Sequence, residues 1–261
     1  MLAALEVPVW QLRAPAIDDL QAASANEPII AQQSASSSNS PSTTDPVIPG
    51  YQNSDQQLAA NQKSEQRVLP GELLSWEGLQ QRVANCRACE LHHDRQQPVL
   101  GQGSQAADWL IVGGAPGSAE ESAAEPFSGR AGQLLTNMML ALGLSLEQIY
   151  LTNIVKCRPA NDRDPSRSER EQCMAHLQHQ VALVKPKIIL LMGASAAHAV
   201  LNNDESVAAL RGRDLVFDNS AIPVVVTQYP ADLLTMADQK SQAWDDLCFA
   251  LRRYNGSLLL E

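Results

Sequence analysis

Four short apolar runs constrain the fold of this chain more than any other feature of its sequence. Each run is continuous rather than alternating and is rich in Val, Ile and Leu, which is typical of parallel strands buried on both faces. Helical patterns separate the runs, and this alternation predicts a parallel sheet with helices on both sides. We therefore expect an α/β domain with three layers, α/β/α, around a central, mostly parallel four-stranded sheet. The runs are 109–112, 149–155, 188–192 and 224–226, and the helical patterns span 131–142, 168–184, 194–201 and 239–252.

The carboxyl ends of the four runs are where we expect the functional residues. Ligands of open parallel sheets bind at the edge where these ends meet. The ends carry the short sequences GGAPG at 113–117, TN at 152–153, MGAS at 192–195 and TQYP at 227–230. The sequence therefore predicts a ligand site made of these four segments.

Two helix ends carry recognisable signals. Ser168 is followed three residues later by Glu171, which fits a capping box, and Gly143 follows the pattern at 131–142 as a C-terminal cap does. We therefore expect one helix to begin at Ser168 and another to end before Gly143.

The first seventy residues differ in composition from the rest of the chain. Residues 31–69 are rich in Ser, Gln, Asn, Pro and Asp, and such a segment cannot bury enough apolar surface to offset its ordering entropy. We expect a disordered linker at 16–69, a globular domain at 70–255 and a short tail at 256–261. The apolar residues 1–15 on this tether predict a partner-binding peptide, or alternatively a strand or helix that packs back onto the domain.

Charge and hydropathy exclude two classes of protein. The net charge of −10 excludes a polycation that holds nucleic acid by overall charge, so any DNA contact must come from local patches. No stretch reaches the ~18 apolar residues of a membrane helix, and the N-terminus lacks the pattern of a signal peptide. We expect a cytoplasmic protein with no membrane contact and a monomeric domain.

Five cysteines in such a chain point to metal ligation or to free thiols rather than disulfides. Cys86 and Cys89 form a C-x2-C pair, and Cys157 and Cys173 lie far downstream. Four thiolates can hold a [4Fe–4S] cluster or a tetrahedral zinc ion, whereas scattered buried thiols are the alternative. Cys248 lies in an ordinary helical pattern and needs no such role.

Several blocks of sequence, in a fixed order between residues 84 and 253, resemble the family 4 (iron–sulfur) uracil-DNA glycosylases. The resemblance implies a [4Fe–4S] cluster on Cys86, Cys89, Cys157 and Cys173, and an enzyme of base-excision repair that hydrolyses or at least recognises uracil in DNA. The blocks are CRACELH at 86–92, VGGAPG at 112–117, PFSGRAGQLL at 126–135, LTNIVKCRP at 151–159, Cys173, MGA at 192–194 and YPADLL at 229–234.

The same resemblance implies roles for individual residues of the base site. Asn153 would read the edge of uracil with its amide, Phe127 would stack on the base, and Ala115 would lie in the base-binding loop. Without the resemblance, Asn153 would be read as a buried residue that satisfies local backbone and Phe127 as core.

The chain departs from the family at both catalytic positions. Gly114 stands where the family has an acidic residue that helps to position or activate water. Tyr229 stands where the family has a histidine that donates a hydrogen bond to the leaving base. Preorganised donors of this kind are worth ~10²–10³ in rate, so we expect weak or lost activity. Neighbouring acids that could substitute, at 120, 121 and 125, are interpreted as solvated surface charges.

Four arginines are candidates for DNA contact by resemblance. Arg158 and Arg163 flank a cluster cysteine, and Arg211 and Arg213 lie in a loop that approaches DNA in the family. A solvated loop in the first case and a simple turn in the second are the alternatives. The DNA would be uracil-containing or single-stranded.

The N-terminal peptide has a resemblance of its own. Val9, Trp10, Leu12 and Arg13 resemble the N-terminal peptide of the psi subunit of bacterial DNA polymerase III, which docks on the clamp loader. The alternative function is therefore a non-catalytic clamp-loader accessory protein in DNA replication, and a third hypothesis is a zinc-stabilised binding module.

Overall fold

The structure, a computed structural model, describes residues 75–218 and 220–258, with side chains to residue 256. The predictions for 1–15 and 16–69, including the clamp-loader peptide around Trp10, lie outside these residues and stay predictions. Within the described part, no helix is both long enough and apolar enough to cross a membrane.

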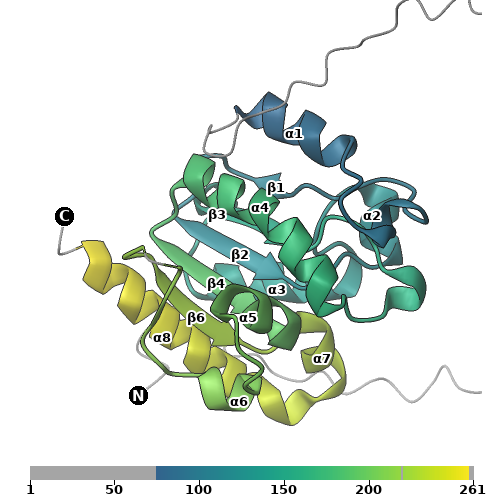
Figure 1. Ribbon diagram of the computed structural model, residues 1–261. Coiled ribbons are helices and arrows are strands. Elements are labelled where there is room, and N and C mark those ends of the chain that lie inside the picture. The colour runs from purple at the N-terminus through teal and green to yellow at the C-terminus, as the bar shows by residue number, and fades with distance from the viewer. Residues whose placement is uncertain (1–74, 219, 259–261) are drawn as a thin grey trace, which may run out of the picture. The chain divides into compact units, whose positions relative to one another are not determined.

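The sheet confirms the predicted core and adds one strand at each edge. Its order is β1–β3–β2–β4–β6–β5, with the four inner strands parallel (Figure 1). The outer strands β1 and β5 have two residues each and pair antiparallel with their neighbours, and apolar runs do not reveal strands so short. The strands are β1 (Gln102–Gly103), β2 (Trp109–Gly113), β3 (Ile149–Asn153), β4 (Ile188–Met192), β5 (Leu215–Val216) and β6 (Pro223–Thr227).

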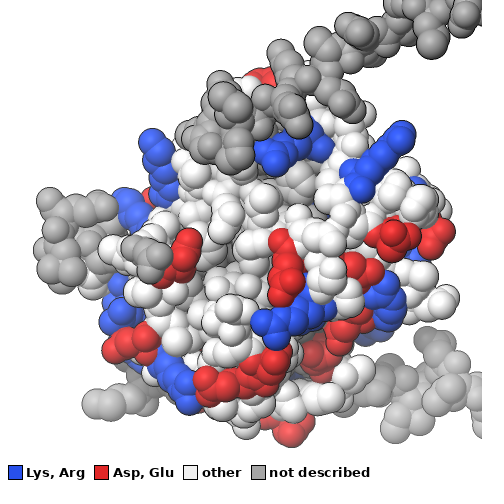
Figure 2. Space-filling model, viewed as in Figure 1, with Lys and Arg blue, Asp and Glu red and all other residues white. Residues whose placement is uncertain are grey.

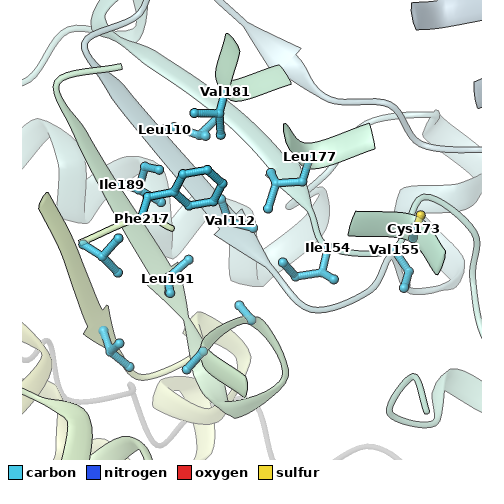
Figure 3. Packing of buried hydrophobic residues seen from close by; sticks show 14 of the residues in the cluster. Leu110, Val112, Ile154, Val155, Cys173, Leu177, Val181, Ile189, Leu191 and Phe217 are labelled. Atoms are coloured by element: carbon cyan, nitrogen blue, oxygen red, sulfur yellow. The ribbon is translucent and has the colours of Figure 1, made fainter. Parts of the chain in front are cut away.

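Helices cover both faces of the sheet, as the strand–helix alternation predicts. On one face, Leu177 and Val181 of α4 pack on sheet residues such as Leu110, together with α5 (Figure 3). On the other face, α3 and α8 pack on Trp109 and its neighbours. Each fully buried large aliphatic side chain contributes about 1.5–3 kcal/mol relative to exposure. The helices are α1 (Trp76–Ala84), α2 (Ser118–Ala123), α3 (Gly129–Ala141), α4 (Arg167–Val184), α5 (Gly193–Leu201), α6 (Val207–Leu210), α7 (Pro230–Thr235) and α8 (Lys240–Leu258).

The predicted capping box of α4 is wrong by two residues. Ser166, not Ser168, caps the helix: its hydroxyl accepts from the Glu169 N–H at 3.3 Å, and Glu169 Oε2 accepts from the Ser166 N–H at 2.7 Å. Glu169 also pairs with Arg163, which lies just before the helix, and this partner favours the earlier start. The other prediction holds in substance, because Gly143 follows the C-cap of α3 with a φ of +81°.

Strand register brings the carboxyl ends together at one edge of the sheet. Gly113 of β2 pairs with Asn153 of β3, and Met192 of β4 pairs with Thr227 of β6. The segments that follow these strands therefore emerge side by side, as expected for a ligand site.

Candidate functional site

The ends of β2 and β3 and the loop before α3 bring the predicted residues Asn153 and Phe127 together beside Gly113. Asn153 is fully buried, and both Nδ2 and Oδ1 of its amide lack a hydrogen-bond partner. A Cβ atom at Gly113 would collide with Asn153 Oδ1 and would lie 2.9 Å from Phe127 Cζ. An unpaired buried amide is costly, and most such groups have a partner. This amide, beside an aromatic ring, is therefore suited to a ligand that supplies its hydrogen bonds.

Phe127 is held in a strained conformation by a buried carboxylate. Its φ of +55° is rare for a bulky residue, and such strain gathers at functional sites. The Phe127 N–H donates to Glu120 Oε1, while Glu120 Oε2 accepts from the Gly117 N–H at 2.6 Å. Burial raises the pKa of Glu120, and the two backbone donors oppose this rise.

The interpretation of the neighbouring acids as solvated is wrong for two of the three. Glu120 is 6% exposed and Glu121 is 2% exposed, whereas Glu125 is exposed as predicted. Glu121 accepts from the backbone N–H of Gln96 at 2.9 Å. Gly117 and Glu120 have the three-residue spacing of a capping box. This spacing is the sequence signal that could have indicated the buried position of Glu120.

A cleft opens beside Gly114 at the same edge of the sheet. A Cβ atom at Gly114 would lie 2.8 Å from the Cβ of Ser195, so the serine occupies space that a side chain at 114 would need. Ser195 Oγ donates to Asp164 Oδ1 at 3.2 Å. The cleft is also lined by Ala115 and Tyr229.

Tyr229 lies between this cleft and Phe127. The centroids of the two rings are 6.0 Å apart, and the rings are inclined by 40°. Burial raises the pKa of Tyr229, and the nearby carboxylates Glu120 and Asp232 raise it further. The hydroxyl is therefore neutral at physiological pH and keeps its proton for donation.

The four predicted ligand cysteines line one small cavity. Cys86 and Cys89 follow α1, Cys157 follows β3, and Cys173 lies on α4, whereas Cys248 does not line the cavity. Figure 3 shows the sulfur of Cys173 at the end of the core, and burial raises the pKa of this thiol to about 11.

Polar side chains surround this cavity. Arg95 Nη1 donates to Cys157 Sγ at 3.0 Å, and His176 Nε2 lies 3.4 Å from Cys86 Sγ. Across 75–218 and 220–258, no three Cys, His, Asp or Glu side chains gather closely enough to hold a single metal ion.

The arginines next to the cysteines pair with carboxylates. Arg158 Nε lies 2.6 Å from Asp162 Oδ1, and the Arg163 guanidinium donates to both oxygens of Glu169 at 2.7 and 2.9 Å. The Arg163 guanidinium lowers the pKa of Glu169 to about 2. On the face shown in Figure 2, basic and acidic residues are interspersed, so DNA contact by these arginines stays a prediction.

The second arginine pair is also engaged. Arg211 Nε donates to Asp246 Oδ1 and Oδ2 at 2.9 and 2.7 Å, which ties the loop to α8. Arg213 Nη1 lies 2.9 Å from Glu205 Oε2. Arg211 and Arg213 pair with carboxylates other than those of Arg158 and Arg163. Within the described residues, no hydrogen bond or ion pair joins the two arginine pairs. Contact of Arg211 and Arg213 with DNA therefore also remains a prediction.

The fold is an α/β domain whose parallel sheet carries a buried amide, an aromatic ring and glycine loops at its carboxyl edge, and sequence comparison places it in a family. The model of the uracil DNA glycosylase superfamily matches residues 100–248, and the chain belongs to this superfamily.

Its relatives include several type-4 uracil-DNA glycosylases. The chain is 36% identical to that of Archaeoglobus fulgidus over 158 residues, which cover 58% of this chain and 79% of the relative. It is 34% identical to that of Pyrobaculum aerophilum over 175 residues, covering 65% and 89%. For Thermotoga maritima the identity is 35% over 155 residues, covering 59% and 80%.

Proposed function

We propose that this protein is an iron–sulfur uracil-DNA glycosylase of base-excision repair with reduced catalytic power. The observation that carries the proposal is the buried amide of Asn153, which has no partner and lies beside Phe127. Uracil supplies the acceptor and donor that such an amide lacks. The type-4 relatives support the choice of uracil as the base.

Binding requires that the nucleotide leave the DNA stack and enter the site. Phe127 stacks on the face of the base, and Asn153 reads its edge. The glycine at 113 is needed because any larger residue would displace both side chains.

In the reaction, water attacks C1′ of the deoxyribose while the bond between C1′ and N1 of uracil breaks. The electron pair of that bond leaves on the base, and the neutral hydroxyl of Tyr229 donates a hydrogen bond to the oxygen that gains charge. The proton of the water passes to solvent, because Gly114 has no carboxylate to receive it. Loss of a general base costs ~10²–10⁴ in rate, so we expect slow release of uracil.

Cys86, Cys89, Cys157 and Cys173 would hold a [4Fe–4S] cluster. The donor set supports this assignment, since the four cysteines line one cavity and four thiolates are the usual ligands of such a cluster. The cluster would cross-link the segments that carry the four cysteines and would add charge at that place in the fold.

The test is single-turnover release of uracil from oligonucleotides with one uracil, single-stranded and double-stranded, by protein purified without oxygen. Wild type should release uracil slowly, and Asn153→Ala should reduce the rate by about 10² or more and abolish the preference for uracil-containing DNA. Asn255→Ala, an exposed asparagine of α8, is the matched control.

Two results would contradict the proposal. The first is a wild-type protein that neither releases uracil nor prefers uracil-containing DNA. The second is an Asn153→Ala variant that equals the control. The cofactor is tested separately, because an iron–sulfur protein is brown and absorbs at roughly 400 nm, whereas zinc has no colour.

A further inference from the structure

A buried lysine connects the cysteine cavity to the proposed base-reading residue. Lys156 lies between β3 and Cys157 and is 1% exposed. Its ammonium donates to Thr152 Oγ1 at 2.7 Å, to the carbonyl of Asn153 at 2.6 Å and to Gln180 Oε1 at 2.7 Å. The three N–H groups are therefore satisfied by uncharged oxygens.

The positive charge of Lys156 lacks a counter-charge on the protein. Within 75–218 and 220–258, no carboxylate lies within ion-pair distance of its Nζ atom, and burial of an ammonium without an anion is strongly unfavourable. Lys156 does line the cysteine cavity, together with Cys157 and Cys173.

A metal-bound form of the cavity would supply the missing negative charge. Metal ligation requires that the cysteines bind as thiolates. Four thiolates carry more negative charge than an oxidised cubane core neutralises. The Arg95 guanidinium lies 3.0 Å from Cys157 Sγ, and Arg95 and Lys156 both line the cavity of the four cysteines.

We propose that Lys156 is a positioning residue: its ammonium serves as a counter-charge to the cluster on the four cysteines and holds the carbonyl of Asn153, so that the Asn153 amide faces the base. This inference rests on the proposed function and names the side chain that couples its cofactor to its base site. It predicts that the occupancy of the cysteine cavity controls how well uracil is discriminated.

The test compares Lys156→Met, which keeps the length and removes the charge, with Lys156→Arg, which keeps the charge. Lys240→Met, an exposed lysine at the start of α8, is the control. The full chain is purified without oxygen. The measurements are the reduction potential of the cluster, the decay of its visible absorbance in air, and the ratio of Kd values for one oligonucleotide with thymine or uracil at the same position.

Lys156→Met should lower the reduction potential, because a nearby cation stabilises the more negative reduced cluster. It should also speed cluster loss by about 10-fold or more and reduce the preference for uracil. Lys156→Arg should restore most of the reduction potential, of the cluster lifetime and of the preference for uracil. If Lys156→Met does not fold, a folded Lys156→Arg with wild-type potential and preference supports the inference, and one that has lost the preference overturns it.

The outcomes separate this inference from the proposed function. Wild type without absorbance near 400 nm overturns the proposed cofactor, and the inference falls with it. Wild type with a cluster, beside a Lys156→Met protein with unchanged potential and unchanged preference, overturns the inference alone.

Discussion

Glutamate at position 114 tests whether one absent side chain explains the slow hydrolysis that we propose. The backbone of Gly114 is not in the left-handed region, so a side chain is conformationally allowed there. The obstacle is space, because the new Cβ would lie 2.8 Å from the Cβ of Ser195. Overpacking of this kind costs about 1–3 kcal/mol, and we expect Gly114→Glu alone to lower the free energy of unfolding by that amount.

Ser195→Gly removes the obstructing atom. By itself it should cost about 1 kcal/mol, because glycine is unfavourable in α5 and because the hydrogen bond to Asp164 is lost. The double variant should be more stable than the sum of the single changes by about 1–3 kcal/mol, since the clash exists only when both side chains are present.

Urea unfolding of the four proteins in this cycle measures the coupling, and single-turnover release of uracil measures its consequence. The double variant should release uracil faster than wild type, and a fully restored general base would raise the rate by at most ~10²–10⁴. Tyr229→His should raise the rate further. Gly256→Glu, at a glycine with no atom within 4 Å of the added Cβ, controls for charge. Additive stabilities, or a Gly114→Glu protein as active as the double variant, would refute the steric argument.

Two further predictions concern buried and paired carboxylates. Glu120→Ala should lower the free energy of unfolding by about 1–3 kcal/mol, because the N–H groups of Phe127 and Gly117 lose their acceptor, and it should weaken binding of uracil-containing DNA; equal urea midpoints for variant and wild type would contradict this. The pKa of Glu169 is lowered in the folded protein to about 2 from an ordinary 4.5. The stability from its pair with Arg163 should therefore be complete above pH 4.5 and be lost as the pH falls toward 2. Arg163→Met should flatten this part of the pH–stability curve, and an unchanged curve would show that the pair is not its source.

Local patterns predicted most of the layered fold. The four apolar runs became the inner parallel strands because a strand buried on both faces must be apolar throughout. The predicted second run, 149–155, continues past the end of β3 at Asn153, because residues 154 and 155 are also buried although they are not in the sheet. Composition alone does not separate these two situations.

The sequence was enough to find the cysteines, the Asn153 segment and the Phe127 segment, and their order along the chain, since each lies in a contiguous block. The contacts between these segments could not be predicted from the sequence. Glu120 looked like a surface charge, and only the fold shows that it is buried under the Phe127 loop. The arginines at 158, 163, 211 and 213 looked free to bind DNA, and the fold pairs each with a carboxylate.

Sequence by itself determined the strand–helix alternation, the edge of the sheet where function lies, and the residue types available for the chemistry. Tertiary structure alone decided that Ser195 fills the space beside Gly114 and that the buried Lys156 lines the cavity of the four cysteines. The physical reason is that periodicity depends on neighbours along the chain, whereas burial, close packing and charge compensation depend on which distant segments the fold brings together.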